Sequence, residues 1–257
     1  MSLRLSATIF RHNARLMLRD PAPMVALLLM PLVMMVFLKP TYEVVLENQG
    51  LAGVNGAEQA VPGLTVLFSF FWVSFVAYSF FREYGWGTWE RLRASPASTA
   101  DILIGKTLPA VILVALQFSV LFGLGAIVFD LDVEGSVIAL VLILTALAIC
   151  VVAATFALVA LARTYSQVEA FSYFAAMVLG GLGGGLAPVD ALPQWAQDVA
   201  PATPTYWAVE GLQGVILDGD DIVSALDSVG VILLFALGFA TVAALRFRVT
   251  ETKVLDT

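Results

Sequence analysis

Three short patterns in the sequence resemble sites that bind a phosphate, a dinucleotide or a cation. The tripeptide Gly-Lys-Thr at 105–107 matches the end of a phosphate-binding loop, but that loop needs a glycine where this chain has Ala100. The glycine-rich run 180–185 fails the dinucleotide pattern, because its last glycine is replaced by Leu186. The acidic turn 218–221 lacks the glycine and the final glutamate of a calcium loop. We therefore expect no catalytic residue and no metal site, and we expect that this chain is not an enzyme.

The composition excludes an ordinary soluble domain. The chain has 257 residues, of which 60% are hydrophobic and 13% are charged, and its mean hydropathy is +0.92. Soluble domains are nearer half apolar and one quarter charged. The single cysteine, Cys150, lies in an apolar run, so the chain forms no internal disulfide. These values are typical of a protein that crosses a membrane several times.

Six runs free of Asp, Glu, Lys and Arg are long enough to cross about 30 Å of hydrocarbon. They lie at 22–38, 61–81, 107–129, 136–162, 170–188 and 229–245. The sequence therefore predicts an all-α membrane protein with six transmembrane helices. We expect one domain over 1–257, made of an interfacial helix (1–21), a six-span bundle (22–246) and a cytoplasmic tail (247–257).

The basic residues predict which side of the membrane each connection occupies. Six spans place every Lys and Arg except Lys39 on the side of the N-terminus, and most acidic residues on the other side. Cytoplasmic connections carry an excess of Lys and Arg. We therefore expect a multi-pass protein of the plasma membrane with both termini in the cytoplasm.

The segment before the first span has the pattern of an amphipathic helix. Four arginines fall within a narrow sector at helical spacing, and apolar residues share a neighbouring face. The arginines are Arg4, Arg11, Arg15 and Arg19, and the apolar residues are Leu3, Ala7, Phe10, Ala14, Met17 and Leu18. This pattern predicts a helix along the inner leaflet that ends at Pro21.

The connection between the second and third spans is unusually long and polar. It is rich in charge, glycine and tryptophan, and a short helix is predicted to be capped by Thr88 and to end before Pro96. One interpretation is a solvated loop with aromatic anchors at the membrane surface. The other is a platform on which a cytoplasmic protein docks.

The spans carry no ionisable residue at their centres, and their polar groups are mild. Ion-coupled carriers and proton relays usually place charged groups there. We expect the path of an amphiphilic or aromatic solute to be lined by Ser69, Trp72, Ser74, Tyr78 and Gln117. The alternative is that these residues face lipid or pack within the bundle.

Two stretches near the fifth span suggest close packing and partial crossing of the membrane. Four glycines form two small-xxx-small pairs, which permit close helix approach. The pairs are Gly180 with Gly184 and Gly181 with Gly185. They indicate either packing within the chain or an interface between two subunits. Beyond them, Pro193 and Pro204 begin two predicted short helices that re-enter the outer leaflet between the fifth and sixth spans.

The connection between the second and third spans also resembles the permease subunits of ABC-2 type exporters. The family pattern is E-x-G-T-x-E-x-L-R-A-S-P, and residues 83–96 read E-Y-G-W-G-T-W-E-R-L-R-A-S-P. Gly105 and Lys106 fit the same family, as do the stretches 187–195 and 201–211. Trp89 stands where the family commonly has leucine. The resemblance extends over essentially the whole chain.

This resemblance implies a subunit that pairs with a second permease, identical or paralogous, and with an ABC ATPase, expected in two copies. ATP and Mg²⁺ would bind to the ATPase, so no cofactor is expected in this chain. In such exporters a coupling helix fits a groove on the ATPase. The residues to which that role is carried over are Glu83, Gly87, Thr88, Glu90, Arg91, Leu92, Arg93, Ser95 and Pro96.

The expected function is export of an amphiphilic or hydrophobic solute, such as a drug or a lipid, by alternating access. Membrane lipid is an expected contact, and nucleic acid is not an expected partner. Two alternatives remain, an ion-coupled secondary carrier and a membrane scaffold that transports nothing. The uncharged span centres argue against the carrier, and a scaffold does not need the long inner connection. The sequence leaves the solute open.

Overall fold

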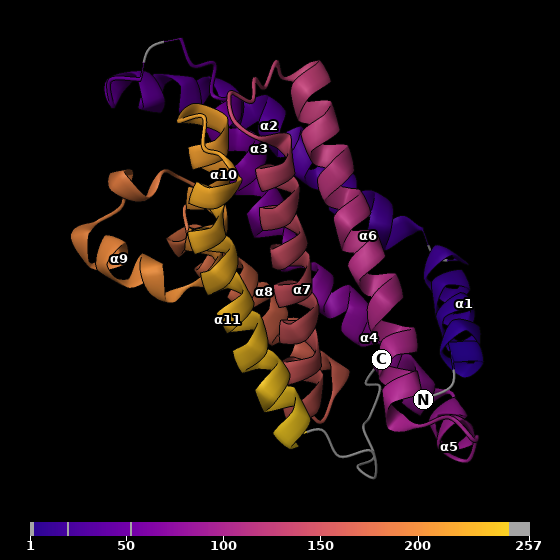
Figure 1. Cartoon of the computed structure of the whole chain (residues 1–257). Helices are drawn as coiled ribbons and strands as arrows, with labels where there is room; N and C mark the ends of the chain where they lie inside the picture. The colour runs from indigo at the N-terminus through magenta and orange to yellow at the C-terminus, as the bar shows by residue number, and fades with distance from the viewer. Residues whose placement is uncertain (1–2, 20, 52, 247–257) are drawn as a thin grey trace.

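All regular structure in the described part of the chain is helical, which confirms the predicted all-α class (Figure 1). The computed structural model describes residues 3–19, 21–51 and 53–246. The predicted cytoplasmic tail, 247–257, lies outside these residues. The longer helices are α1 (Leu3–Arg19), α2 (Ala22–Asn48), α3 (Ala57–Ser69), α4 (Trp72–Gly85), α6 (Thr99–Val128), α7 (Val137–Leu161), α8 (Tyr165–Leu182), α10 (Pro204–Leu217) and α11 (Ile222–Arg246). The short ones are α5 (Thr88–Arg93), η1 (Val189–Ala191), α9 (Gln194–Val199) and η2 (Ala200–Ala202).

Five helical segments of the described chain are long and apolar enough to cross a membrane. They are Ala22–Asn48, Ala57–Gly85, Ile104–Val128, Val137–Leu161 and Ile222–Arg246. The second consists of α3 and α4, which are separated at Phe70 and Phe71. These five correspond to the first four predicted spans and to the sixth, so the chain is a multi-pass membrane protein.

The first span is longer than predicted. The sequence ends the apolar run at 38, whereas α2 continues to Asn48 through Pro40. Lys39 lies within this helix, and its Nζ donates a hydrogen bond of 2.8 Å to the carbonyl oxygen of Phe129. The ammonium group of Lys39 is therefore bonded to the residue that directly follows α6.

The predicted fifth span, 170–188, is helical only in its first part. α8 ends at Leu182, before the predicted end at 188. α10 ends beside the start of α7, where the backbone N–H of Gly135 donates to the carbonyl oxygen of Val215 at 2.9 Å. α8 begins shortly after the other end of α7. α10 packs on α7, whereas α8 packs on α3 and α4. Neither α8 nor α10 is among the helices long and apolar enough to cross a membrane, so the count of six spans stays a prediction.

The core lies where α3 and α7 meet their neighbours. Every residue of α3 is buried, and α2, α6, α8 and α10 pack against it. Gly63 permits one of these approaches, since a Cβ atom there would lie 2.8 Å from the carbonyl oxygen of Gly185. α7 packs most extensively against α11. α3 is therefore shielded by the helices around it.

The predicted N-terminal helix is present as α1, but only part of its predicted apolar face is buried. Met17 of that face is buried, whereas Ala7 and Leu18 are exposed, and the polar residue Ser6 is buried as well. α1 packs against α6. Ser6 Oγ donates to Asp101 Oδ1 at 2.9 Å. The four predicted arginines are exposed, as expected. A position along the inner leaflet stays a prediction for α1.

Candidate coupling helix and inner cavity

The short helix α5 follows a turn at Gly87. This glycine is the N-cap and has a φ of 66°, in the left-handed region that favours glycine. The prediction that Thr88 caps the helix is wrong, because its Oγ1 donates to the carbonyl oxygen of Glu83 at 3.3 Å. α5 ends at Arg93, before Pro96 as predicted. In Figure 1, α5 lies at the same end of the bundle as the start of α1 and the end of α11.

The aromatic residue of α5 anchors it and leaves its charged residues outside. Trp89 is buried and stacks on Tyr84, with ring centroids 4.8 Å apart. Glu90 and Arg91 are exposed, and Leu92 and Ser95 are half-buried. Ser95 Oγ donates to the carbonyl oxygen of Leu92 at 2.6 Å and closes the turn after α5. The side chain of Arg93 lies outside the described residues, and Pro96 is exposed. The exposed carboxylate and guanidinium can therefore meet a partner protein.

Glu83 differs from the other predicted coupling residues, because it is buried. Its Oε1 forms an ion pair of 2.6 Å with Lys106 Nζ on α6. Lys106 also lies over the ring of Phe80, 4.5 Å from its centroid. Glu83 therefore ties the end of α4 to α6, and its role in coupling stays a prediction. The sequence analysis missed this pair, because no local pattern relates two positions on different helices.

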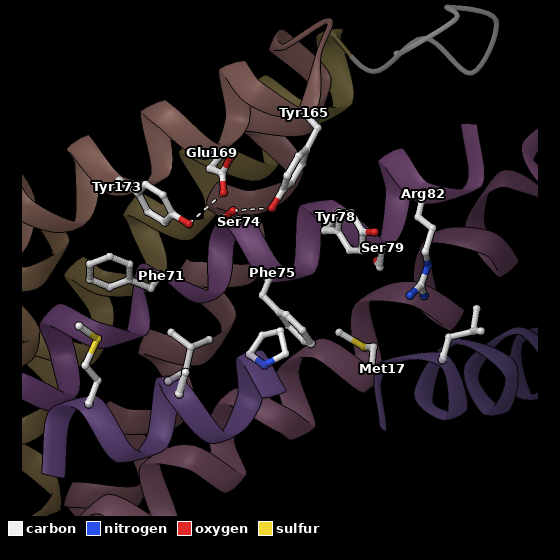
Figure 2. A pocket seen from close by; sticks show the side chains of 15 residues that line it. Met17, Phe71, Ser74, Phe75, Tyr78, Ser79, Arg82, Tyr165, Glu169 and Tyr173 are labelled. Carbon is white, nitrogen blue, oxygen red and sulfur yellow. Dashed lines mark hydrogen bonds between the residues drawn. The ribbon is translucent and has the colours of Figure 1, made fainter. Parts of the chain in front are cut away.

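A cavity of about 520 Å³ lies between α1, α2, α4 and α8, next to the end of α4 (Figure 2). Two residues of the predicted solute path, Ser74 and Tyr78, line it. The complete lining is Leu16, Met17, Pro23, Ala26, Leu27, Met30, Phe71, Ser74, Phe75, Tyr78, Ser79, Arg82, Tyr165, Glu169 and Tyr173. Aromatic and aliphatic side chains predominate, which is typical of a site for an amphiphilic molecule.

Two hydrogen bonds join polar side chains of the cavity wall. The hydroxyl groups of Ser74 and Tyr165 lie 3.0 Å apart, and Tyr173 donates to Glu169 Oε1 at 3.0 Å. Figure 2 shows both pairs on one side of the cavity, away from Arg82. The sequence analysis missed Tyr165, Glu169 and Arg82 as lining residues. Arg82 follows Ser74 and Tyr78 at successive intervals of four residues, which indicates that the three share a helix face.

The other three predicted path residues are buried within the bundle and do not line the cavity. Trp72 donates its indole N–H to Gln117 Oε1, and Gln117 Nε2 donates to the carbonyl oxygen of Leu27 at 2.8 Å. Ser69 Oγ donates to the carbonyl oxygen of Val66 within its own helix. Trp72 and Gln117 therefore connect α4, α6 and α2 behind the cavity wall. A direct role for them in transport stays a prediction.

The glycine run shapes the end of α8. A Cβ atom on Gly180 would lie 2.8 Å from Leu67 Cγ, so this glycine permits packing on α3. Gly184 has a φ of 86° and lies in the turn after the helix, as does Gly185. The predicted pairing as two helical small-xxx-small motifs is therefore wrong. A Cβ atom on Gly181 would lie 3.9 Å from Leu186 Cδ1, which is an ordinary contact. A subunit interface at these glycines stays a prediction.

The acidic turn 218–221 caps the last helix. Asp221 Oδ1 accepts hydrogen bonds from the backbone N–H groups of Val223 and Ser224 at 2.9 and 3.0 Å. These donors, with the Ser224 hydroxyl, hold the pKa of the Asp221 carboxyl below its usual value. Among the described residues, no group of three or more His, Cys, Asp or Glu side chains could hold a metal ion. The turn is therefore explained by helix capping.

The comparison with known proteins identifies the class to which this fold and site belong. The sequence profile of the ABC-2 type transporter family matches residues 5–217. The chain therefore belongs to the ABC-2 type transporter family.

Two curated relatives are permeases. The chain is 25% identical to the linearmycin resistance permease protein LnrN of Bacillus subtilis (strain 168) over 190 residues, which are 74% of this chain and 49% of the relative. It is 26% identical to the probable multidrug ABC transporter permease YbhR of Escherichia coli (strain K12) over 147 residues, which are 56% of this chain and 39% of the relative. The matched region thus spans half or less of each relative.

Proposed function

We propose that this chain is a membrane-spanning permease subunit of an ATP-driven exporter. It moves an amphiphilic or hydrophobic solute outward by alternating access, while a separate ABC ATPase binds ATP and Mg²⁺ and hydrolyses the ATP. Two ATPase copies and a second permease, identical or paralogous, complete the transporter in the plasma membrane. Family membership over 5–217 supports the permease role, and the relatives' printed names concern resistance to linearmycin and multidrug transport.

The observation that carries this proposal is the joint position of α5 and the cavity. α4 bears both, since Ser74 and Tyr78 line the cavity and α5 follows after only two residues. The ion pair between Glu83 and Lys106 fixes the last turn of α4 to α6. A push on α5 therefore reaches the cavity wall through one short, anchored connection. This arrangement supports a role of α5 in ATP-driven opening and closing.

The cavity also favours a solute that is neither small nor strongly hydrated. Its volume of about 520 Å³ lies within the range of sites that hold drug-sized molecules, roughly 300–1,000 Å³. Phe71, Phe75 and Tyr78 supply apolar surface along one side. An amphiphile enters such a space at a lower desolvation cost than an ion does.

Co-purification tests the proposal. The tagged chain, expressed with an ABC ATPase encoded beside its gene, should retain that ATPase in mild detergent and acquire ATP hydrolysis. The isolated chain should hydrolyse no ATP. If the chain never retains an ATPase under conditions that preserve its fold, the exporter assignment fails. A scaffold would retain the ATPase without solute-dependent stimulation, so adding candidate amphiphiles separates these two roles.

A further inference from the structure

Arg82 carries a buried charge that the described residues leave without a hydrogen-bonded partner. It is 9% exposed and lines the cavity. Its Nε makes no hydrogen bond. The nearest carboxylate in sequence, Glu83, pairs with Lys106 instead. Among the described residues no carboxylate lies within ion-pair distance of Arg82.

The contacts that Arg82 does make are aromatic. Its guanidinium carbon lies 5.7 Å from the ring centroid of Tyr78 and 5.0 Å from that of Trp86. Cation–π contacts orient a guanidinium, but they do not replace its hydrogen bonds. A buried, always-charged group without an anion is costly. The guanidinium therefore has a charge and N–H donors available to an anion in the cavity.

The shape of the cavity indicates what kind of anion this is. Arg82 lies near the end of α4, and Phe71 lies eleven residues earlier, about 16 Å away along the helix. Figure 2 shows the guanidinium at one end of the cavity near Met17, Phe75 in the middle and Phe71 at the other end. A charged end and an apolar body of this length match an elongated amphiphile.

The carboxylate that lines the cavity, Glu169, does not pair with Arg82. Glu169 on α8 accepts the hydrogen bond of Tyr173 at 3.0 Å, and no ion pair joins it to Arg82. The hydroxyl groups of Ser74 and Tyr165 bond to each other. Arg82 is therefore the group in the lining that offers unused N–H donors and a positive charge.

We propose that Arg82 binds the anionic headgroup, a phosphate or a carboxylate, of an amphiphile whose apolar body lies along α4 toward Phe71. This assignment rests on the proposed export function and specifies the class of solute. Arg82 selects for the negative charge, and Phe71 and Phe75 select for the apolar chain.

Binding to the purified full-length chain in a nonionic detergent tests the assignment. The probe is oleoyl lysophosphatidic acid, and its matched control is monooleoylglycerol, which has the same acyl chain without the phosphate. The wild-type chain should bind the phosphate probe at least about tenfold more tightly than the control. The phosphate can accept charge-assisted hydrogen bonds from Arg82, whereas monooleoylglycerol has no charged group. Equal binding of the two probes would overturn the proposal.

Variants identify the residue responsible. Arg82→Gln should bind both probes equally, and Arg82→Lys should keep part of the preference because it keeps the charge but loses the planar fork. Arg11→Gln removes an exposed arginine from α1 and should retain the full preference. Matched thermal unfolding of the variants confirms that each is folded. A phosphate preference that survives in folded Arg82→Gln contradicts the proposal.

The source of the anion is settled by lipid analysis of the same preparations. If a membrane phospholipid supplies the headgroup, about one phospholipid per chain accompanies the wild type and Arg11→Gln but not Arg82→Gln. If a transported solute supplies it, the phosphate probe binds without releasing phospholipid. Both results support an anionic amphiphile at Arg82. Because no ATPase is present, this binding result is independent of the co-purification experiment.

Discussion

Glu83 and Lys106 form a buried ion pair whose members come from different helices. Lys106 is 1% exposed, and its only carboxylate partner among the described residues is Glu83, at 2.6 Å. Removing one member of a buried pair leaves an uncompensated charge and costs about 3–5 kcal/mol. We therefore expect Glu83→Gln to lower the free energy of unfolding in detergent by that amount.

The double variant Glu83→Gln with Lys106→Met provides the control for this prediction. It removes both charges, so its stability should lie closer to the wild type than that of Glu83→Gln. Denaturant unfolding in detergent measures all three chains. Additive losses in the double variant would show that the two side chains are not coupled.

Glu90 is exposed on α5 and is the best candidate for an electrostatic contact with an ATPase. Glu90→Lys places a further positive charge beside Arg91 and removes a carboxylate that can pair with a basic group. A charge-assisted pair is worth about 1.5–3 kcal/mol. We expect ATPase co-purification to fall about tenfold or more, with export abolished and membrane insertion and permease pairing unchanged.

Glu47→Lys is the matched control, since it reverses an exposed glutamate in the last turn of α2. It should retain the ATPase at the wild-type level when expression is matched. If Glu90→Lys also retains the ATPase and exports normally, α5 is only a solvated connection.

At the scale of single residues, the sequence predicts the chemical character of the cavity better than it predicts which residues line the cavity. Ser74 and Tyr78 were predicted because mild polar groups among aromatics suit an amphiphile, and both line the cavity. Trp72 and Gln117 have the same character, but they bond to each other behind the wall. Composition alone does not distinguish the face of α4 toward the cavity from the face toward α6.

At the scale of helices, α6 begins with a capping box. Ser98 Oγ accepts from the backbone N–H of Asp101 at 3.2 Å, and Asp101 Oδ2 accepts from the backbone N–H of Ser98 at 3.0 Å. Asp101 also receives the Ser6 hydroxyl of α1. We expect Ser98→Ala to lower the free energy of unfolding by about 0.5–2 kcal/mol, through loss of the cap.

Thermal unfolding in detergent measures this loss, and Ser98→Thr, which keeps the hydroxyl, should restore most of it. A full loss in Ser98→Thr would show that the hydroxyl is not the stabilising group.

Helices with one uninterrupted apolar run could be predicted from the sequence. α7 lies within one charge-free run and has satisfied backbone hydrogen bonds without help from neighbours, so hydropathy located it. α8 and α10 were not resolved in this way. Gly184 ends α8 early, and Thr205 of α10 donates its hydroxyl to the carbonyl oxygen of Leu179. Such a division depends on contacts between segments, which hydropathy does not record.

At the scale of the whole molecule, topology is the prediction to test. Single cysteines at Ser95 and Ser224, with Cys150 replaced by Ala, should react oppositely with an impermeant thiol reagent. Ser224 lies in the first turn of α11, shortly after α10, and Ser95 follows α5. We expect labelling of Ser224→Cys in intact cells and of Ser95→Cys only after the cells are permeabilised, because basic residues mark the cytoplasmic side. Equal labelling of both in sealed cells would contradict the six-span topology.

The complete burial of α3 has a consequence for biosynthesis. The ribosome releases α3 before α6, α8 and α10, the helices that later cover it. Gln59, which donates to the carbonyl oxygen of Gly184 at 2.7 Å in the finished protein, has no such acceptor at that time. The nascent hairpin of α2, α3 and α4 therefore carries an unsatisfied amide at the membrane until residue 184 has been synthesised. α3 therefore reaches its final surroundings only after the helices that cover it have been synthesised.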